Sequence, residues 1–76
     1  MPSKTVRYLQ DIVENAQAIL LYTKGMSLPI FTADRKTYDA VERCLERISE
    51  AAARLGGEAP VLVAGQPWEK IRALGN

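Results

Sequence analysis

The sequence predicts an all-α protein that folds as an up-and-down helical bundle, with two long antiparallel helices and a short third helix. Three observations support this fold class. Apolar residues recur at helical spacing over two long segments, residues 4–24 and 34–55. Ser3, a residue type that caps helices, precedes the first segment, and glycine follows both segments. The length of 76 residues, with 47% apolar and 25% charged residues, is that of one small globular domain over residues 1–76.

The first predicted helix covers residues 4–24, with Ser3 as its N-cap and Gly25 just past its end. Leu21 and Tyr22 lie off the apolar stripe of this helix. They are either ordinary surface residues or the edge of a partner interface, and we take them as candidate dimer contacts. The stripe itself consists of Val6, Leu9, Ile12, Val13, Ala16, Ile19 and Leu20.

Residues 26–33 read as a connector with room for one helical turn, capped by Ser27 and tolerant of Pro29. We expect Phe31 to close one end of the core.

The second long helix should cover residues 34–55 and end at Gly56-Gly57. Cys44 flanks its apolar seam, and we expect it to be a small buried residue rather than a reactive thiol. The seam steps by three and four residues through Tyr38, Val41, Leu45, Ile48, Ala52 and Leu55.

The other face of this second helix is charged, with both signs interspersed. Asp39 with Arg43, and Glu50 with Arg54, have the order that favours ion pairs four residues apart. Helix geometry alone therefore predicts a solvated face linked by salt bridges.

After the glycines, the apolar run 61–64 fits either an extended connector or a helical turn, and a last helix should begin at Pro67. Trp68, Ile71 and Leu74 follow at helical spacing. Two long amphipathic helices need more cover than one short helix provides. We therefore expect a dimer partner, or a further helix beyond Asn76, to complete the bundle.

Composition excludes several kinds of function. Ten Lys and Arg against nine Asp and Glu leave a net charge of +1, so nucleic-acid binding would need local charge. The chain has no histidine and one cysteine, which excludes a zinc site built from the usual ligands, and we expect no metal and no cofactor. The sequence shows no signal peptide and no membrane span. We expect a cytoplasmic protein.

The segment "FTADRKTYDAVERCLERISEAAARL" followed by "PWEKIRALGN" resembles the HEPN superfamily, in its HepT-like toxin branch. "DIVENAQAILLYTKG" is similar to the opening helix of that family. The matching positions are Asp34, Thr37, Ala40, Val41, Ile48, Glu50, Ala51, Ala52, Pro67, Trp68, Ile71, Leu74 and Asn76.

The resemblance implies a dimeric helical bundle that acts as a metal-independent ribonuclease toxin on RNA. It also implies neutralisation by a partner antitoxin, a minimal nucleotidyltransferase. The family signature is an Arg, often followed by Asn, then a His four to six positions after the Arg, and a Tyr that the partner modifies. Here Ser49 replaces a family Gly, Gly75 stands where the Arg belongs, and the His and Tyr would lie beyond Asn76.

These departures predict that the chain stops before its catalytic turn and is inactive as 76 residues. The alternative is that Gly75 caps a finished helix and Asn76 is a free end.

Three residues are candidates for what remains of the site. Glu50 is either a solvated ion-pair partner or, as the resemblance implies, a residue that orients the catalytic Arg or His. Arg72, three positions before Gly75, could supply a cation to bound RNA. Asn76 could position phosphate or water, or could cap the helix.

Three functions follow. The first is a HepT-like ribonuclease toxin. The second is a non-catalytic helical module for dimerisation or protein binding, with a degenerate site. The third is a structural fragment of a larger bundle that is stable only as an oligomer.

Overall fold

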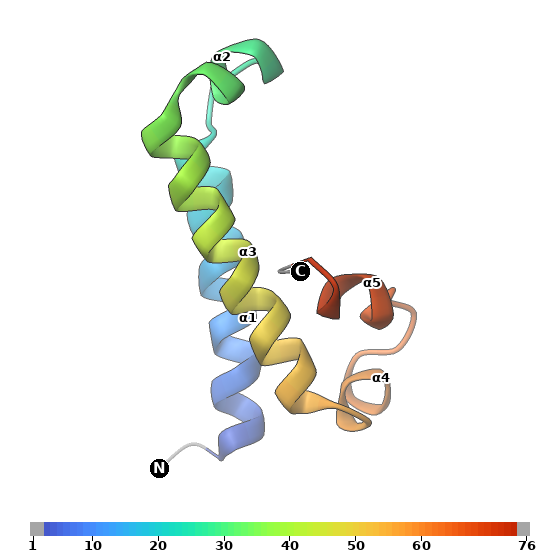
Figure 1. Ribbon diagram of the computed structural model, residues 1–76. Helices are drawn as coiled ribbons and strands as arrows, with labels where there is room; N and C mark the ends of the chain where they lie inside the picture. Colours follow the sequence, from blue (N-terminus) through green and yellow to red (C-terminus); the bar gives the residue numbers. More distant parts are fainter. Residues whose placement is uncertain (1–2, 75–76) are drawn as a thin grey trace.

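A computed structural model describes residues 3–74, which form five helices and no strand (Figure 1). The all-α prediction is confirmed, although two of the short helices occupy segments where we expected at most a turn. No helix within residues 3–74 is long and apolar enough to cross a bilayer. The helices are α1 (Lys4–Tyr22), α2 (Leu28–Ala33), α3 (Arg35–Leu55), α4 (Glu58–Leu62) and α5 (Trp68–Arg72).

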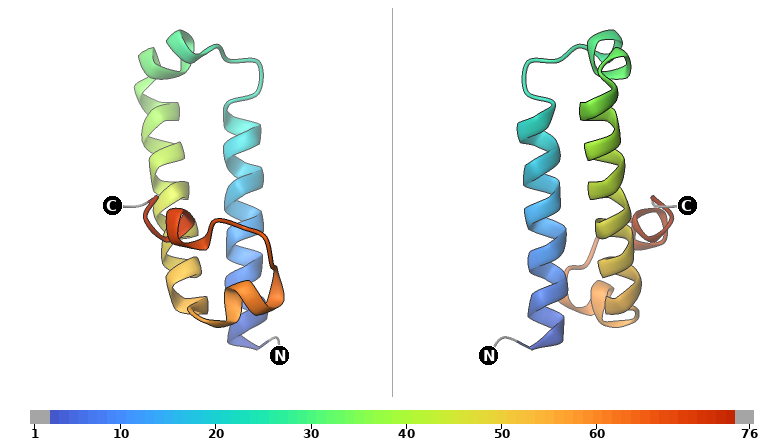
Figure 2. Two further views of the ribbon diagram at one scale, coloured as in Figure 1. Left: turned by 90° about the vertical axis from the view of Figure 1, so that its right-hand side faces the viewer. Right: turned by 60° about the vertical axis from the view of Figure 1, so that its left-hand side comes forward.

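The two long helices run antiparallel, side by side (Figure 2). α2 lies at the end of the pair where the chain turns, and α4 and α5 lie toward the other end, with α5 beside α3 (Figures 1 and 2). Every other helix packs against α3, which makes it the centre of the fold.

Side-chain caps set the starts of the first three helices. Ser3, Ser27 and Asp34 each accept a hydrogen bond from the backbone N–H three residues later, at 3.2–3.3 Å. α1 ends at Tyr22, two residues before the predicted end, and Thr23 follows as its C-cap, donating both its N–H and its hydroxyl to the Ile19 carbonyl. Gly56 ends α3 at a φ of 53°, as predicted for a glycine in this place.

The core lies along α3 and toward its C-terminal end. The predicted seam of α3 is confirmed for Val41, Ile48, Ala52 and Leu55, and Cys44 is buried as expected. Tyr38, at the other end of the seam, stays exposed and lies against Phe31 with ring centroids 5.5 Å apart. The inner cluster joins α3 to α4 and α5 through Ala52, Leu55, Ala59 and Trp68.

α1 is only half covered by the rest of the chain. None of its nineteen residues, all within the described part of the chain, is fully buried. Val6, Val13 and Leu20 are 43%, 52% and 72% exposed. They repeat every seven residues, so they form an outer apolar row, whereas Leu9 and Ile12 pack inward on the core cluster.

The chain is more open than a compact protein of its size. It exposes 5651 Å², against about 4600 Å² for a compact monomer of 8.4 kDa. Its radius of gyration is 13.5 Å, against about 11 Å for a compact chain of this length. The difference of about 1000 Å² approximates one side of a standard protein–protein interface.

Two polar contacts hold α5 in place. The Ser49 hydroxyl, on a buried side chain of α3, donates to the Arg72 carbonyl at the end of α5. The Trp68 indole N–H donates to the Val63 carbonyl at 2.9 Å. α5 stops at Arg72, so Leu74 lies in a turn and the last helix is shorter than expected.

Two further expectations are settled by the structure. The run 61–64 is divided, with α4 ending at Leu62 and Val63 extended. The predicted ion pair of Asp39 with Arg43 is wrong. The Arg35 guanidinium pairs with the Asp39 carboxylate, and the Arg43 guanidinium pairs with the Glu46 carboxylate, each with an N–O distance of 3.0 Å. The pair of Glu50 with Arg54 is confirmed at 2.8 Å.

Candidate functional site

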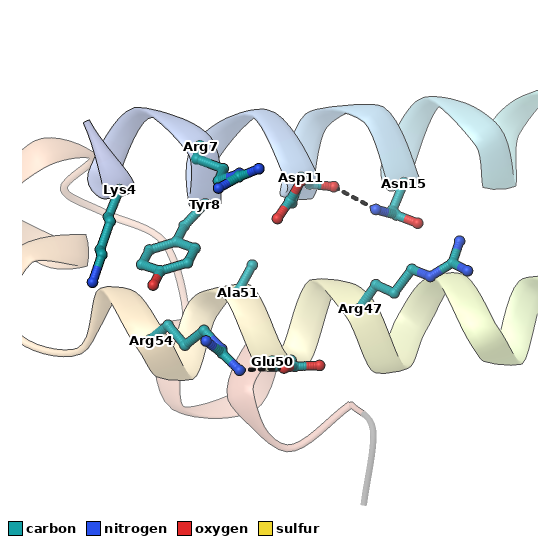
Figure 3. Close-up of a pocket in the computed structure, with 9 residues that line it drawn as sticks. All are labelled: Lys4, Arg7, Tyr8, Asp11, Asn15, Arg47, Glu50, Ala51 and Arg54. Atoms are coloured by element: carbon teal, nitrogen blue, oxygen red, sulfur yellow. Dashed lines mark hydrogen bonds and ion pairs between the residues drawn. The ribbon is translucent and has the colours of Figure 1, made fainter. Parts of the chain in front are cut away.

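A charged groove of about 480 Å³ lies between α1 and α3 (Figure 3). Both helices supply its walls, and Ala51, which is buried, lies between the longer side chains. The lining residues are Lys4, Arg7, Tyr8, Asp11 and Asn15 from α1, and Arg47, Glu50, Ala51 and Arg54 from α3.

Helical spacing explains why these side chains meet. The α1 residues lie at positions 4, 7, 8, 11 and 15, and those of α3 at 47, 50, 51 and 54. Steps of three and four residues place side chains on one face of a helix. Because α1 and α3 pack antiparallel, the two polar faces border the same groove (Figure 3).

The groove is positive. Lys4, Arg7, Arg47 and Arg54 face only two carboxylates, those of Asp11 and Glu50, which leaves a formal charge of +2. The remainder of the chain has six Lys and Arg against seven Asp and Glu, a formal charge of −1. The groove is therefore a positive site on a protein whose other surfaces are slightly negative.

Glu50 is an ion-pair partner within this groove. Its carboxylate accepts from Arg54 at 2.8 Å, and both side chains are more than half exposed. Tyr8 and then Glu50 raise the pKa of the Arg54 guanidinium above its ordinary value. The reading of Glu50 from helix geometry is thus supported, and its orienting role stays a prediction.

Several cations of the groove form no ion pair with the part of the chain that the structure describes. Lys4, Arg7 and Arg47 form no ion pair within residues 3–74, and neither does the carboxylate of Asp11. Asn15 is tied to its own helix, since its amide donates to the Asp11 carbonyl at 2.7 Å. Cations without a partner are available to an anionic ligand.

Arg72 lies elsewhere. It lines a separate cavity beside Trp68 and Gly56, between α5 and the end of α3. The structure therefore does not bring Arg72 into the groove that holds Glu50. Asn76, like Gly75, lies outside the described residues.

Leu21 and Tyr22 are exposed at the end of α1, at 70% and 45%. Leu20 beside them is exposed too, as are Leu28 and Ile30 of α2 at the same end of the bundle. This exposure agrees with ordinary surface residues and with the edge of a partner interface, so it does not distinguish these two interpretations of Leu21 and Tyr22.

The sequence analysis missed most of the groove. Glu50 and Arg54 were readable as an ion pair, but Lys4, Arg7 and Arg47 were not identified, and the first helix was described only by its apolar stripe. The spacing of Lys4, Arg7, Tyr8, Asp11 and Asn15 was a readable signal of a polar face. That this face would border the charged face of α3 depends on packing, which spacing within one helix does not give.

Comparison with known proteins identifies the family. Residues 12–76 match the family described as "Ribonuclease HepT-like". A Methanocaldococcus jannaschii protein named "Putative RNase MJ0127" is 39% identical over 75 residues, which are 97% of this chain and 62% of that protein. The "Probable ribonuclease HepT" of Thermococcus cleftensis is 34% identical over 64 residues, 84% of this chain and 58% of that protein.

The chain spans about 60% of the length of these two curated relatives. No solved structure matches it significantly. Since the family match runs from residue 12 to the last residue, which is more than half of the chain and includes all of α3 and α5, this chain belongs to the HepT-like ribonuclease family.

Proposed function

We propose that this chain is the N-terminal part of a metal-independent ribonuclease that serves as the toxin of a cytoplasmic toxin–antitoxin system. The observation that carries the proposal is the family match over residues 12–76, together with two relatives whose names describe ribonucleases. Because the chain covers only part of those relatives, the activity belongs to the longer protein.

The chemistry of RNA cleavage supports a location of the catalytic histidine and arginine outside these 76 residues. Cleavage of RNA without a metal needs a base for the 2′-hydroxyl, an acid for the leaving oxygen and a cation for the phosphorane. A histidine suits the proton transfers near pH 7, and an arginine suits the phosphorane. The chain has no histidine, and Gly75 stands at the place of the signature arginine. We therefore propose that the 76 residues alone do not cleave RNA.

In the longer protein, Asn76 would position phosphate or water next to the catalytic turn. Arg72 would add a cation near the RNA, and Glu50 would orient the catalytic pair. The geometry supports Glu50 least in that role, since it is engaged by Arg54 at 2.8 Å.

The open surface of α1 supports a homodimer. Val6, Val13 and Leu20 form an exposed apolar row, and the chain exposes about 1000 Å² more than a compact monomer would. A second copy on this row, with Leu21 and Tyr22 at its edge, would cover that surface. The antitoxin, a minimal nucleotidyltransferase, would bind the dimer and neutralise it.

A non-catalytic binding module is the second candidate function. Gly75 in place of arginine favours it, as does the amount of exposed apolar surface on α1. This candidate predicts a protein partner and no cleavage of RNA by any form of the protein.

The test is RNA cleavage by the protein purified from its native source, with EDTA present and with the 76-residue chain as control. We expect cleavage by the native protein that persists in EDTA, none by the control, and co-purification of a nucleotidyltransferase. Cleavage that requires a divalent metal, or no cleavage by the native protein, would contradict the proposal.

A further inference from the structure

We propose that the groove between α1 and α3 binds the phosphate backbone of a single RNA strand along its length. This inference deepens the proposed function, on which it rests, by assigning the path of the substrate to residues outside the catalytic signature. The residues that carry it are Lys4, Arg7, Arg47 and Arg54, with Tyr8 and Asn15 between them.

The distribution of charge favours a linear anion. The cations occur on both walls and are spread along the helices rather than gathered at one point. From Lys4 to Asn15 the axis of α1 rises about 16 Å, at about 1.5 Å per residue. At about 3.4 Å per nucleotide this distance accommodates roughly four or five stacked nucleotides. A small anion such as inorganic phosphate would contact only one or two of these groups.

The width of the groove favours one strand over a duplex. Packed helices have axes about 8–10 Å apart, so their side chains border a narrow channel. A strand fits between the side chains of α1 and α3, whereas a duplex would rest on their tips.

The hydrogen-bonding groups agree with this ligand. Arg7 and Arg47 have no ion-pair partner within residues 3–74, and guanidinium groups bind phosphate with two parallel hydrogen bonds. Tyr8 is half-buried beside Arg54 and offers its ring and its hydroxyl at the floor. Arg54 remains protonated at every physiological pH, so its charge is permanent.

The alternative ligand is an acidic segment of a protein, which would meet the same charges. The carboxylates of Asp11 and Glu50 would repel both ligands, since an extended acidic peptide and an RNA strand carry charges at a similar spacing. Tyr8 favours RNA, because a base can stack on its half-buried ring and an acidic peptide has no such group. We therefore assign the groove to RNA.

The experiment measures binding of the 76-residue chain to a fluorescently labelled single-stranded RNA of about ten nucleotides by anisotropy, over roughly 50–200 mM salt. The RNA carries 2′-O-methyl groups, which block cleavage, so the readout is independent of activity. The double variant Arg7→Gln and Arg47→Gln removes two groove cations. The control, Lys24→Gln and Lys36→Gln, removes the same charge outside the groove, also from exposed side chains.

We expect the groove variant to bind at least about tenfold more weakly at low salt, with a salt slope lower by about 1.4, since each lost phosphate contact changes it by about 0.7. The control should change affinity less than about threefold. All four positions are exposed, and circular dichroism confirms that each variant keeps its helicity.

Three results would overturn the inference: no RNA binding by the unmodified chain, equal losses in the two variants, or displacement of the RNA by poly-glutamate as effective as by unlabelled RNA. The last would mark an acidic protein segment as the ligand. The inference and the proposed function fail separately. If the native protein cleaves RNA but the groove variant binds RNA normally, only the assignment of the groove is wrong. If the groove binds RNA but the native protein does not cleave it, only the proposed nuclease activity is wrong.

Discussion

The two long helices have similar lengths and similar N-caps, yet they are packed very differently. α3 buries seven of its twenty-one residues, and α1 buries none of its nineteen. The cause is the number of neighbours, because α1, α2, α4 and α5 all pack on α3. The comparison teaches that α3 carries the stability of the fold, while α1 offers its two outer surfaces, one apolar and one charged, to other molecules.

The largest difference between the helices should appear when the same substitution is made in each. Leu55→Ala removes a side chain of α3 that is 3% exposed and touches the inner cluster. We expect a loss of about 2–5 kcal/mol, most of the roughly 3–5 kcal/mol that a core of this size provides. Urea unfolding followed by circular dichroism measures it.

Leu20→Ala on α1, at 72% exposure, is the matched control and is measured at a protein concentration at which the chain is monomeric. Under that condition it should change stability by less than about 0.5 kcal/mol. Equal losses from the two leucine variants in the monomer would show that the rest of the chain covers α1 to the same extent as α3.

The apolar row of α1 gives the second prediction. Val13→Glu places a charge in the proposed dimer surface, and we expect dimer dissociation at concentrations at least about tenfold higher than for the unmodified chain. Sedimentation velocity across a concentration series measures this.

The control for that variant is Ala53→Glu, an exposed position on α3, which should leave self-association unchanged. If the unmodified chain is monomeric at all concentrations, the proposal that a second copy covers the apolar row of α1 is refuted.

Two serine hydroxyls sharpen the comparison further. Ser49→Ala removes the hydrogen bond from α3 to the Arg72 carbonyl, and we expect a loss of about 1 kcal/mol with faster amide exchange in α5. Ser3→Ala removes the N-cap bond to Val6 and should speed exchange only in the first turn of α1. Hydrogen exchange followed by NMR separates the two patterns, and unchanged protection of α5 in the Ser49 variant would contradict the role given to its hydroxyl.

The smallest effect concerns the charged surface. Glu50→Gln leaves Arg54 without its partner and adds one positive charge to the groove, so RNA affinity at low salt should rise by a few-fold. Glu46→Gln, which frees Arg43 outside the groove, is the control and should have less effect. Stability should not change measurably in either variant, because both ion pairs are solvent-exposed. A lower affinity after Glu50→Gln would contradict the assigned role of the groove.

Much of the fold could be predicted from the sequence, because helix caps and apolar seams depend on residues that are close together in the chain. Ser3 and Ser27 cap the helices they were expected to cap, since a cap depends on a few neighbouring residues, whereas Asp34 caps α3 instead of being its first residue. The seam of α3 was readable because its neighbours cover it along most of its length. The stripe of α1 was identified as apolar, but periodicity does not show how much of an apolar face a neighbour covers.

The candidate site was less accessible from the sequence. Glu50 and Arg54 were recognised as a pair because both lie on one helix at a favourable spacing. The same reasoning failed for Asp39, where Arg35 competes with Arg43 from the other direction. The groove as a whole joins residues about forty positions apart, from Arg7 to Arg47, so it appears only when α1 and α3 are packed together.

The most direct test of the account is the intact mass of the protein from its native source, with sequencing of its C-terminal peptide. The account predicts a mass above the 8.4 kDa of these 76 residues, and a peptide that continues past Asn76 into a histidine and a tyrosine. A mass of 8.4 kDa with Asn76 as the last residue would contradict it and leave a helical binding module in place of a nuclease.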